Sequence, residues 1–525
     1  MSQIEEILRR RTFAIISHPD AGKTTLTEKL LLFGGAIQTA GAVKANKVRK
    51  YASSDFMEIE RQRGISVATS VMAFNYKNIK INLLDTPGHQ DFCEDTYRTL
   101  TAVDSTVMVI DCVKGVEAQT EKLLEVCRMR KTPVITFINK LDREGLEPVD
   151  LLDRVEKELK IRICPMSWPI GMGRSLKGVY SLFEKKILLF KPHETHQSTD
   201  SVLISDLADP SLDANIGTDA AATLRNEIEL ISGIYPPFNV EEYLTGEVTP
   251  VFFGSAINNF GVRELLDCFI SIAPSPKPHA AMPRTVLPEE NSFSGFVFKI
   301  HANMDPRHRN RIAFLCVCSG KFERNKNYYH VRLNREMRFS SPTAFMAQEK
   351  NIIDEAWPGD IIGIPDTGNF QIGDTLTEGE TLSFTGIPRF SPEIFKYVVN
   401  KDPLKTKQLE KGLLHLMDEG LAQMFTHDIN SRKIIGVVGA LQFEVITHRL
   451  KSEYGASCAF EPIEIHKACW ISAEQNILDE FCSKNRPLIA ADPDGRKVFL
   501  AESRYMLELA KSENPDIVFH LTSEL

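Results

Sequence analysis

The sequence lacks several features that would place it in a special class of protein. No apolar run approaches the roughly 18 residues of a membrane-spanning helix, and no two of its 10 cysteines stand in a C-x-x-C spacing. Cys316 and Cys318 lie two residues apart in an apolar run, where a strand would place both on one face as small hydrophobic side chains rather than as a metal site or a disulfide. We therefore expect a protein of the reducing cytoplasm that does not associate with membranes.

A large excess of positive charge is also absent. The formal net charge of -8 excludes a surface that is basic throughout, so any contact with nucleic acid would depend on local basic loops. Two such stretches contain Lys44, Lys47, Arg49 and Lys50, and Arg307, His308, Arg309 and Arg311. Charged loops are more often simply solvated, and charge alone does not assign them to RNA.

The length of 525 residues suggests three or four domains. In the first part, short apolar runs alternate with helical patterns, which predicts a mainly parallel sheet covered on both faces. The expected strands are 13–16, 79–84, 106–110, 134–138 and 251–253, and the expected helices are 26–33, 94–103, 117–130 and 262–272. We predict one α/β domain over 1–285 with an insertion at about 145–245, partly flexible around 193–218.

The pattern changes after a proline-rich linker at 274–283. Short β-branched and aromatic runs at 293–300, 312–318, 328–333 and 361–364 predict an antiparallel barrel or sandwich, assigned as a β-barrel domain over 292–385. A helix with Leu409, Leu413, Leu416 and Met417 on one face, a strand at 434–438 and a helix at 441–450 predict an α+β domain over 389–525. No internal repeat at a fixed period is visible.

Residues 17–24 follow an apolar strand, open a helix and match the phosphate-loop pattern G-x-x-x-x-G-K-[ST], with Ser17 in place of the first glycine. Backbone N–H groups of such a loop turn toward phosphates, Lys23 reaches the β and γ phosphates, and Thr24 offers a hydroxyl to Mg²⁺. Asp20 either helps to hold a cation or only shapes the turn. The expected phosphate-binding residues are Ser17, His18, Pro19, Asp20, Ala21, Gly22, Lys23, Thr24, Thr25 and Gly88.

Asp85 follows the strand at 79–84 and begins the run Asp-Thr-Pro-Gly-His. A carboxylate there can hold Mg²⁺ through water, and Gly88 can turn its N–H toward a γ-phosphate, which makes the following segment a switch. Ser66 would add a hydroxyl to the metal, so the predicted magnesium ligands are Thr24, Ser66 and Asp85. His89 is placed to orient the attacking water.

Asn139, Lys140, Leu141 and Asp142 follow a further strand and predict the base-binding site. The Asp142 carboxylate can accept from N1–H and the 2-amino group of guanine, which adenine does not offer, and this discriminates by roughly 10⁴-fold or more. Lys140 can cover the base, and Asn139 can bind back to the phosphate loop. Ser255 and Ala256 follow another strand and can offer an N–H to guanine O6. The nucleotide is therefore predicted to be GTP, converted to GDP.

With these motifs the sequence resembles the translational GTPases, the family of elongation factors Tu and G. Longer strings resemble the class II peptide chain release factors of bacteria within that family. Those strings are 11–20, 94–100, 168–171, 303–306, 439–444 and 449–454. Ser66 stands where the family usually has threonine, and Ser17 departs from its usual glycine or alanine.

The resemblance implies a role on the ribosome. The GTP-bound protein would bind rRNA and ribosomal proteins of a terminating ribosome as a monomer and promote departure of a codon-reading class I release factor. Hydrolysis, stimulated by the ribosome, would allow its own exit. Pro19 and Ile65 would form an apolar gate beside His89.

Two alternatives differ in what they require. A translocase like elongation factor G predicts further C-terminal domains, whereas this sequence ends at Leu525. A GTP-dependent factor that binds or assembles ribosomal particles would need little turnover of its own, whereas Lys23, Thr24, Asp85 and His89 favour catalysis.

Overall fold

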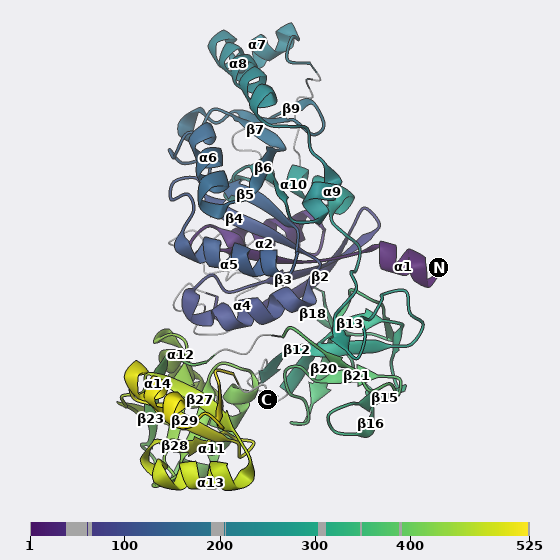
Figure 1. The fold of residues 1–525 in the computed structure, drawn as a ribbon. Coiled ribbons are helices and arrows are strands. Elements are labelled where there is room, and N and C mark those ends of the chain that lie inside the picture. Colours follow the sequence, from purple (N-terminus) through teal and green to yellow (C-terminus); the bar gives the residue numbers. More distant parts are fainter. Residues whose placement is uncertain are drawn as a thin grey trace.

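The computed structural model describes residues 2–37, 60, 66–190, 204, 206–302, 311–346, 349–387 and 391–522. Figure 1 shows three parts: an α/β part that contains the N-terminus, a curled β domain beside it, and a C-terminal α+β part. The predicted fold class is confirmed. No helix within these described ranges is both long and apolar enough to cross a bilayer.

A mainly parallel sheet forms the centre of the α/β part, as predicted. Its strands in spatial order are β2 (Ser70–Tyr76), β3 (Ile79–Asp85), β1 (Arg10–Ser17), β4 (Ser105–Asp111), β5 (Val134–Asn139), β10 (Val248–Phe253) and β6 (Arg162–Pro165). Only the β2–β3 pair is antiparallel. The carboxyl ends of the parallel strands consequently meet at one edge of the sheet, where ligands bind in such folds.

Helices cover both faces of this sheet, because successive residues of a strand point to opposite sides. Phe13 and Ile15 pack in one core with α2 (Lys23–Phe33) and α10 (Val262–Ile272). Ala14 and Ile16 pack in another core with α5 (Ala118–Met129) and α6 (Pro148–Leu159). Strands buried on both faces need continuous apolar runs, which explains why most strands of this sheet could be predicted from the sequence.

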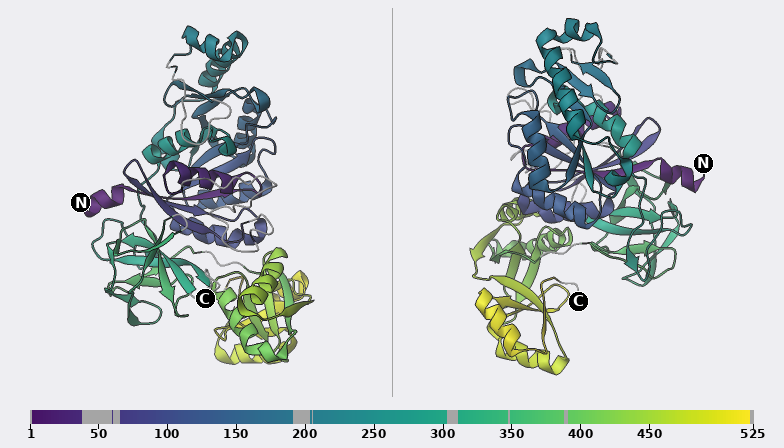
Figure 2. Two further views of the ribbon diagram at one scale, coloured as in Figure 1. Left: turned by 180° about the vertical axis from the view of Figure 1, so that it is seen from behind. Right: turned by 45° about the horizontal axis from the view of Figure 1, so that its top comes forward.

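The stretch at 145–245 is more ordered than its sequence suggests. Its strand β6 belongs to the central sheet, while β7 (Ser167–Ile170), β8 (Gly178–Ser181) and β9 (Lys186–Leu189) form a separate antiparallel sheet. The helices α7 (Pro210–Ile216), α8 (Thr218–Ile234) and α9 (Val240–Leu244) follow. In Figures 1 and 2, α7 and α8 lie at the end of the molecule opposite the C-terminal part.

The last part of the stretch 193–218 forms the helix α7, while its predicted flexibility remains a prediction. The Asp209 carboxylate accepts from Ser211 N at 2.8 Å and caps α7, while Leu212 and Ile216 are buried. Two buried residues spaced four apart are too few to give a recognisable helical pattern in this polar stretch. Residues 191–203 lie outside the described ranges.

The β domain is a curled antiparallel sheet. Its strands run in the order β16 (Arg335–Arg338), β15 (Asn327–His330), β21 (Thr375–Thr377), β12 (Ser294–Ala302), β13 (Arg311–Ser319), β20 (Ile361–Asp366), β17 (Thr343–Met346) and β18 (Glu349–Ile352). Its core contains Phe293, Val297, Leu315, Tyr328 and Leu376. A parallel bridge between Met346 in β17 and Ala73 in β2 makes this sheet continuous with the sheet of the α/β part.

The C-terminal part contains the same topology twice. Its first half is β23 (Ile394–Asn400), α11 (Thr406–Asp418), β24 (Gln423–His427), β25 (Lys433–Val437), α12 (Leu441–Tyr454) and β26 (Cys458–Pro462). Its second half is β27 (Lys467–Ser472), α13 (Gln475–Lys484), β28 (Ile489–Ala491), β29 (Lys497–Ala501), α14 (Arg504–Glu513) and β30 (Val518–His520).

Within each half the first strand lies between the third and the fourth, and the two halves join where β24 pairs with β28. No repeat was expected from the sequence. The repetition lies in the order and pairing of the elements, and not in a sequence period that residues at fixed spacing would reveal.

Arg311 does not belong to an exposed basic loop. Its side chain is buried and forms ion pairs with Asp366 at 2.7 Å and with Asp418 of the C-terminal part. A guanidinium held in this way joins two domains and is not available to RNA. The other basic residues named above, Lys44, Lys47, Arg49, Lys50, Arg307, His308 and Arg309, lie outside the described residues.

Candidate functional site

A cavity of about 330 Å³ opens at the carboxyl edge of the central sheet, a volume within the range of small-molecule sites. It brings together most of the residues that the sequence predicts for nucleotide binding. The lining contains Ser17, His18, Pro19, Asp20, Gly22, Lys23, Thr24, Thr25, Ser66, Gly88, His89, Asn139, Lys140, Asp142, Arg143 and Ile257. Of the predicted residues, Ala21, Asp85, Ser255 and Ala256 lie behind this lining, and Ile65 is outside the described residues.

The loop between β1 and α2 wraps the first side of the cavity. Gly22 has φ +93°, in the left-handed region, and a Cβ there would lie 2.4 Å from Asn139 Nδ2. Both the backbone conformation and the close approach therefore require glycine. No side chain caps the N-terminus of α2, so its first N–H groups remain available to an anion.

Lys23 and Asp85 form an ion pair in which both side chains are buried. The second carboxylate oxygen of Asp85, Oδ2, has no hydrogen-bond partner among the described residues. An unpartnered buried oxygen costs free energy unless a ligand satisfies it. Because Thr24 and Ser66 line the cavity beside it, these oxygen donors fit a hard divalent cation such as Mg²⁺.

His18 is completely buried, and both of its ring nitrogens lack a hydrogen-bond partner among the described residues. Burial lowers the pKa of His18, so its imidazole is neutral at physiological pH. His18 belongs to the loop that lines the cavity, and its imidazole is an uncharged side chain with one donor and one acceptor. Its assigned phosphate contact remains a prediction.

Asn139 ties the phosphate loop to the base-binding segment. Its Nδ2 donates to Ala21 O at 2.8 Å, and its Oδ1 accepts from Ala256 N at 2.9 Å. Ser255 N donates to Phe260 O, and the Ser255 hydroxyl donates to the Asp142 carboxylate. The backbone N–H groups of Ser255 and Ala256 are thus engaged within the protein, and the guanine contact assigned to them remains a prediction.

Asp111 is a site residue that the sequence did not reveal. It ends β4, and its Oδ2 accepts from Lys140 Nζ at 2.7 Å, while Lys140 also donates to Asp20 O. Although burial alone would raise the pKa of Asp111, the hydrogen bonds from Lys140 and from Val113 N lower it. The charged carboxylate therefore fixes the Lys140 side chain. An acidic residue at the end of a parallel strand was the available signal.

His89 lies across the cavity from the loop and belongs to the segment that follows β3. Its Nδ1 lies 3.2 Å from the donor Asp91 N and 3.4 Å from Asp91 Oδ1. The preceding Gly88 lies so close to the loop that a Cβ there would be 3.3 Å from Ser17 O. Gly88, predicted to contact the γ-phosphate, and His89, predicted to orient the attacking water, consequently border the same cavity as Lys23.

A second group of potential ligands lies between the α/β part and the β domain. His279, Cys316 and Cys318 place their donor atoms within 4.8 Å of one another, and no other such group occurs in the described ranges. Burial raises the pKa of Cys318 well above its usual value and lowers the pKa of His279 to about 4. These uncharged side chains pack in the interface between the α/β part and the β domain. Cys316 and Cys318 were expected to pack in this way, as small hydrophobic side chains.

Comparisons with known proteins divide the chain in the same way. Residues 8–275 match the family model of the elongation factor Tu GTP binding domain, and residues 292–379 match elongation factor G domain 2. Residues 384–511 match the C-terminal domain of the class II release factor RF3. A crystal structure of a protein from Thermus thermophilus is similar at a TM-score of 0.70, with 21% identity over 89% of this chain and 71% of that one, which shows a shared fold.

Proposed function

We propose that this protein, which belongs to the translational GTPases, promotes the dissociation of class I peptide chain release factors from bacterial ribosomes after peptide release. The reason is that its GTP-binding domain is joined to a C-terminal domain of the class II release factor type. The C-terminal match carries this proposal, since the other two domains are common to factors with different tasks. We further propose that the protein acts as a monomer in the cytoplasm and that the ribosome stimulates its hydrolysis of GTP.

The Lys23–Asp85 pair explains how the cavity receives its ligands. The two side chains form an ion pair in which each charge compensates the other. Phosphates offer Lys23 a replacement for the carboxylate, and a cation offers Asp85 a replacement for the ammonium group. Both exchanges keep each buried charge compensated, which makes joint binding of nucleotide and cation more favourable than binding of either alone.

Thr24, Ser66 and Asp85 would hold Mg²⁺, which supplies positive charge where negative charge develops during phosphoryl transfer. The N–H groups at the start of α2 and the Lys23 ammonium group bind and orient the phosphates. Asp142 selects guanine, and Lys140, held by Asp111, supports the base. His89 orients the attacking water, and Pro19 with Ile65 limits its approach until the ribosome is bound.

The proposal is tested with ribosomes stalled on a stop codon that carry a fluorescent class I release factor. Dissociation of that factor is measured with and without this protein and GTP. We expect dissociation to accelerate in a GTP-dependent manner. Unchanged dissociation together with accelerated tRNA–mRNA movement would instead identify a translocase, and stable binding to ribosomal particles without either effect would identify an assembly factor.

The catalytic assignment is tested separately with His89→Ala. We expect GTP binding to persist, whereas ribosome-stimulated hydrolysis falls by about 10²-fold or more, the usual contribution of a positioned acid–base group. The matched control is His466→Ala, because His466 is exposed in the C-terminal part. Equal turnover in the two variants would remove the role assigned to His89.

A further inference from the structure

The segment that carries His89 is held directly by the C-terminal part of the chain. Asp91, two residues after His89, accepts from Leu441 N at 2.8 Å. Leu441 is the first residue of α12, and Ala440, which precedes it, has no side chain that caps the helix. Asp91 of the GTP-binding domain therefore supplies the missing N-terminal cap of a helix in another domain, where a negative charge is also favoured by the helix dipole.

The two segments approach each other without intervening side chains. A Cβ at Gly439 would lie 2.0 Å from Asp91 Cγ, closer than nonbonded atoms approach. Asp91 itself is buried. Beside it, Phe92, Val67 and Val445 form a small apolar cluster drawn from both domains. The position of Asp91 thus depends on the position of α12.

Asp91 offers the His89 imidazole two alternatives. When Nδ1 is unprotonated it accepts from Asp91 N at 3.2 Å, and the ring proton is then on Nε2. When Nδ1 is protonated it faces Asp91 Oδ1 at 3.4 Å, and Nε2 is then free to accept a proton from water. The printed geometry at Nδ1 is a hydrogen bond from Asp91 N, and Oδ1 lies at ion-pair distance. A carboxylate that accepts from Nδ1–H orients a histidine for water activation.

We propose that Asp91 is a positioning residue for GTP hydrolysis, which holds His89 with Nε2 ready to accept from water, and that α12 of the C-terminal domain controls this by holding Asp91. The inference rests on the proposed role of His89. It gives the C-terminal domain a direct effect on the chemistry, because a movement of α12 displaces the carboxylate that orients the imidazole.

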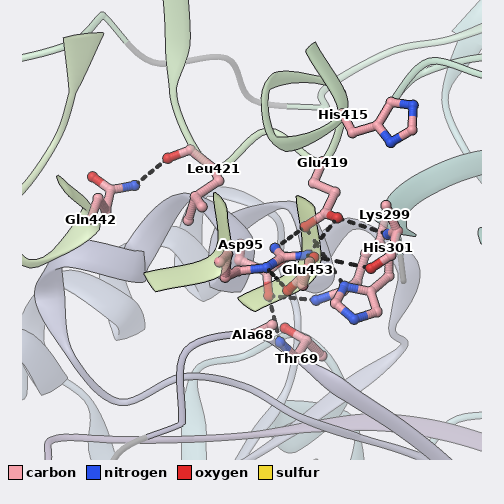
Figure 3. Close-up of polar contacts among 12 residues, drawn as sticks. Ala68, Thr69, Asp95, Lys299, His301, His415, Glu419, Leu421, Gln442 and Glu453 are labelled. Carbon is pink, nitrogen blue, oxygen red and sulfur yellow. Dashed lines mark hydrogen bonds and ion pairs between the residues drawn. The ribbon is translucent and has the colours of Figure 1, made fainter. Parts of the chain in front are cut away.

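Contacts around Asp91 would couple a movement of α12 to the other two domains. Arg98 in α4 (Cys93–Thr99) donates to Gly420 O at 2.8 Å in the C-terminal part, and it pairs with Glu94 at 2.9 Å. Asp95, on the same helix, accepts from Thr69 N at 2.6 Å and pairs with Lys299 of the β domain at 2.9 Å (Figure 3). One short helix after His89 therefore contacts both other domains.

A second set of contacts closes the junction from the side of the C-terminal part. Glu419 accepts from Ala302 N of β12 at 2.7 Å and forms an ion pair with Arg449 of α12. All of these groups are withdrawn from solvent. Because charges buried in this way tolerate only paired arrangements, intermediate positions of the domains are unfavourable and the junction favours discrete states.

Two variants separate the parts of the proposal. Asp91→Asn keeps a side chain of the same shape, but its amide group can donate to Nδ1 and so favour the wrong tautomer. Gly439→Ala leaves Asp91 intact and displaces its carboxylate from the other side. Gly233→Ala is the matched control, because Gly233 lies in exposed helix α8 with open space around its Cα.

Hydrolysis is measured in single-turnover reactions with saturating stop-codon ribosomes, alongside the affinity for a fluorescent GTP analogue. We expect both Asp91→Asn and Gly439→Ala to lower the rate constant by roughly 10- to 100-fold, as loss of an outer partner of a functional histidine does. The affinities for nucleotide and for ribosomes should remain within about twofold, and Gly233→Ala should behave as the unaltered protein.

A spectroscopic measurement separates orientation of His89 from a general loosening of the interface. In protein labelled with ¹⁵N-histidine, the His89 signals, identified by their loss in His89→Ala, report which ring nitrogen carries the proton. We expect Asp91→Asn to shift this population from Nδ1–H toward Nε2–H. Unchanged tautomers and unchanged rates would overturn the proposal.

Failure of this inference is distinguishable from failure of the proposed function. If His89→Ala abolishes hydrolysis while both new variants retain it, His89 is catalytic but is not positioned through Asp91. If Asp91→Asn is slow but Gly439→Ala is normal, the control by α12 is refuted. If His89→Ala itself has no effect, the catalytic assignment fails whatever the two variants do.

Discussion

Lys23 and Asp85 form an ion pair at the wall of the nucleotide cavity, and their side chains are only 7% and 1% exposed. The pair links the phosphate loop to the end of β3. Binding of nucleotide and cation would give Lys23 a phosphate partner and Asp85 a cation partner.

We predict that Asp85→Asn uncouples nucleotide binding from magnesium. Without the carboxylate, the cation loses its charged protein ligand, while Lys23 can still bind phosphates. Added Mg²⁺ should then strengthen GTP binding by roughly 10- to 100-fold less than in the unaltered protein. The check is titration with a fluorescent GTP analogue with and without a chelator. Asp153→Asn, which removes an exposed pair with Lys157, is the control; equal Mg²⁺ dependence in both variants contradicts the assignment.

Guanine recognition is tested with inosine triphosphate, which lacks the 2-amino group. The unaltered protein should bind GTP more tightly than inosine triphosphate, because the Asp142 carboxylate would lose one of two donors. In Asp142→Ala the two affinities should become equal, since no acceptor for either donor remains. Asp153→Ala is the control, because it removes an exposed carboxylate that pairs with Lys157 outside the cavity. Retained preference for GTP in Asp142→Ala would show that other groups read the base.

The domain junction should be far more sensitive to Arg449 than to a comparable surface arginine. The Arg449 side chain is 3% exposed and pairs with Glu419 and Glu453. Arg449→Ala removes the arginine partner of the buried Glu419 and of the partly buried Glu453, and it should lower the free energy of unfolding of the C-terminal part by about 3–5 kcal/mol.

Arg432→Ala provides the comparison within the same domain. Arg432 pairs with Glu461, but the two side chains are 38% and 55% exposed, so its loss should cost less than about 1 kcal/mol. Scanning calorimetry of both variants measures the difference, and nucleotide affinity reports whether the GTP-binding domain remains folded. Similar transitions in the two variants would contradict the assigned importance of the junction.

Asp104 should make stability depend on pH near neutrality. Burial raises its pKa to about 7, although the N–H group and charge of Lys277 and the charge of Arg11 act in the opposite direction. A folded-state pKa above the unfolded value of about 3.9 means that the stabilising proton is bound at low pH and is lost as pH rises to 7. The unaltered protein should therefore lose at most about 4 kcal/mol from this group over that interval.

Asp104→Asn removes the titration of Asp104 and leaves those of neighbouring His279 and Cys318 unchanged. The amide oxygen can still accept from Lys277 N, so the local hydrogen bond is kept. Relative to the unaltered protein, the variant should gain thermal stability as the pH rises from 5 to 8. A difference in transition temperature that is the same at all pH values would contradict the raised pKa.

The local patterns were most informative where a single physical rule determines the outcome. The helix predicted at 262–272 is α10 (Val262–Ile272), because its apolar residues recur with a helical period and bury one face. Lys23 and Thr24 were identified because a phosphate loop needs these residues in one short stretch. Asn139, Lys140 and Asp142 were found for the same reason, since one loop after one strand carries all three.

Other features escaped the sequence because they depend on residues that are far apart in it. The antiparallel strand β2 lies between β17 and β3, and the edge strand β6 has only four residues, so the place of each in the sheet depends on strands that are distant in the sequence. Asp111 became recognisable as a site residue only when Lys140 was placed 2.7 Å from it. Arg311, part of an apparently basic loop, became buried through Asp366 and Asp418.

The sequence by itself determined the chemistry of the nucleotide site, because the backbone turns and side chains that bind phosphate lie within one short loop. It also determined the class of each domain through the periods of its apolar residues. Only the tertiary structure decided that Asp91 and Leu441, 350 residues apart, share a hydrogen bond. That contact depends on how three folded domains pack, and no local pattern of residues contains this information.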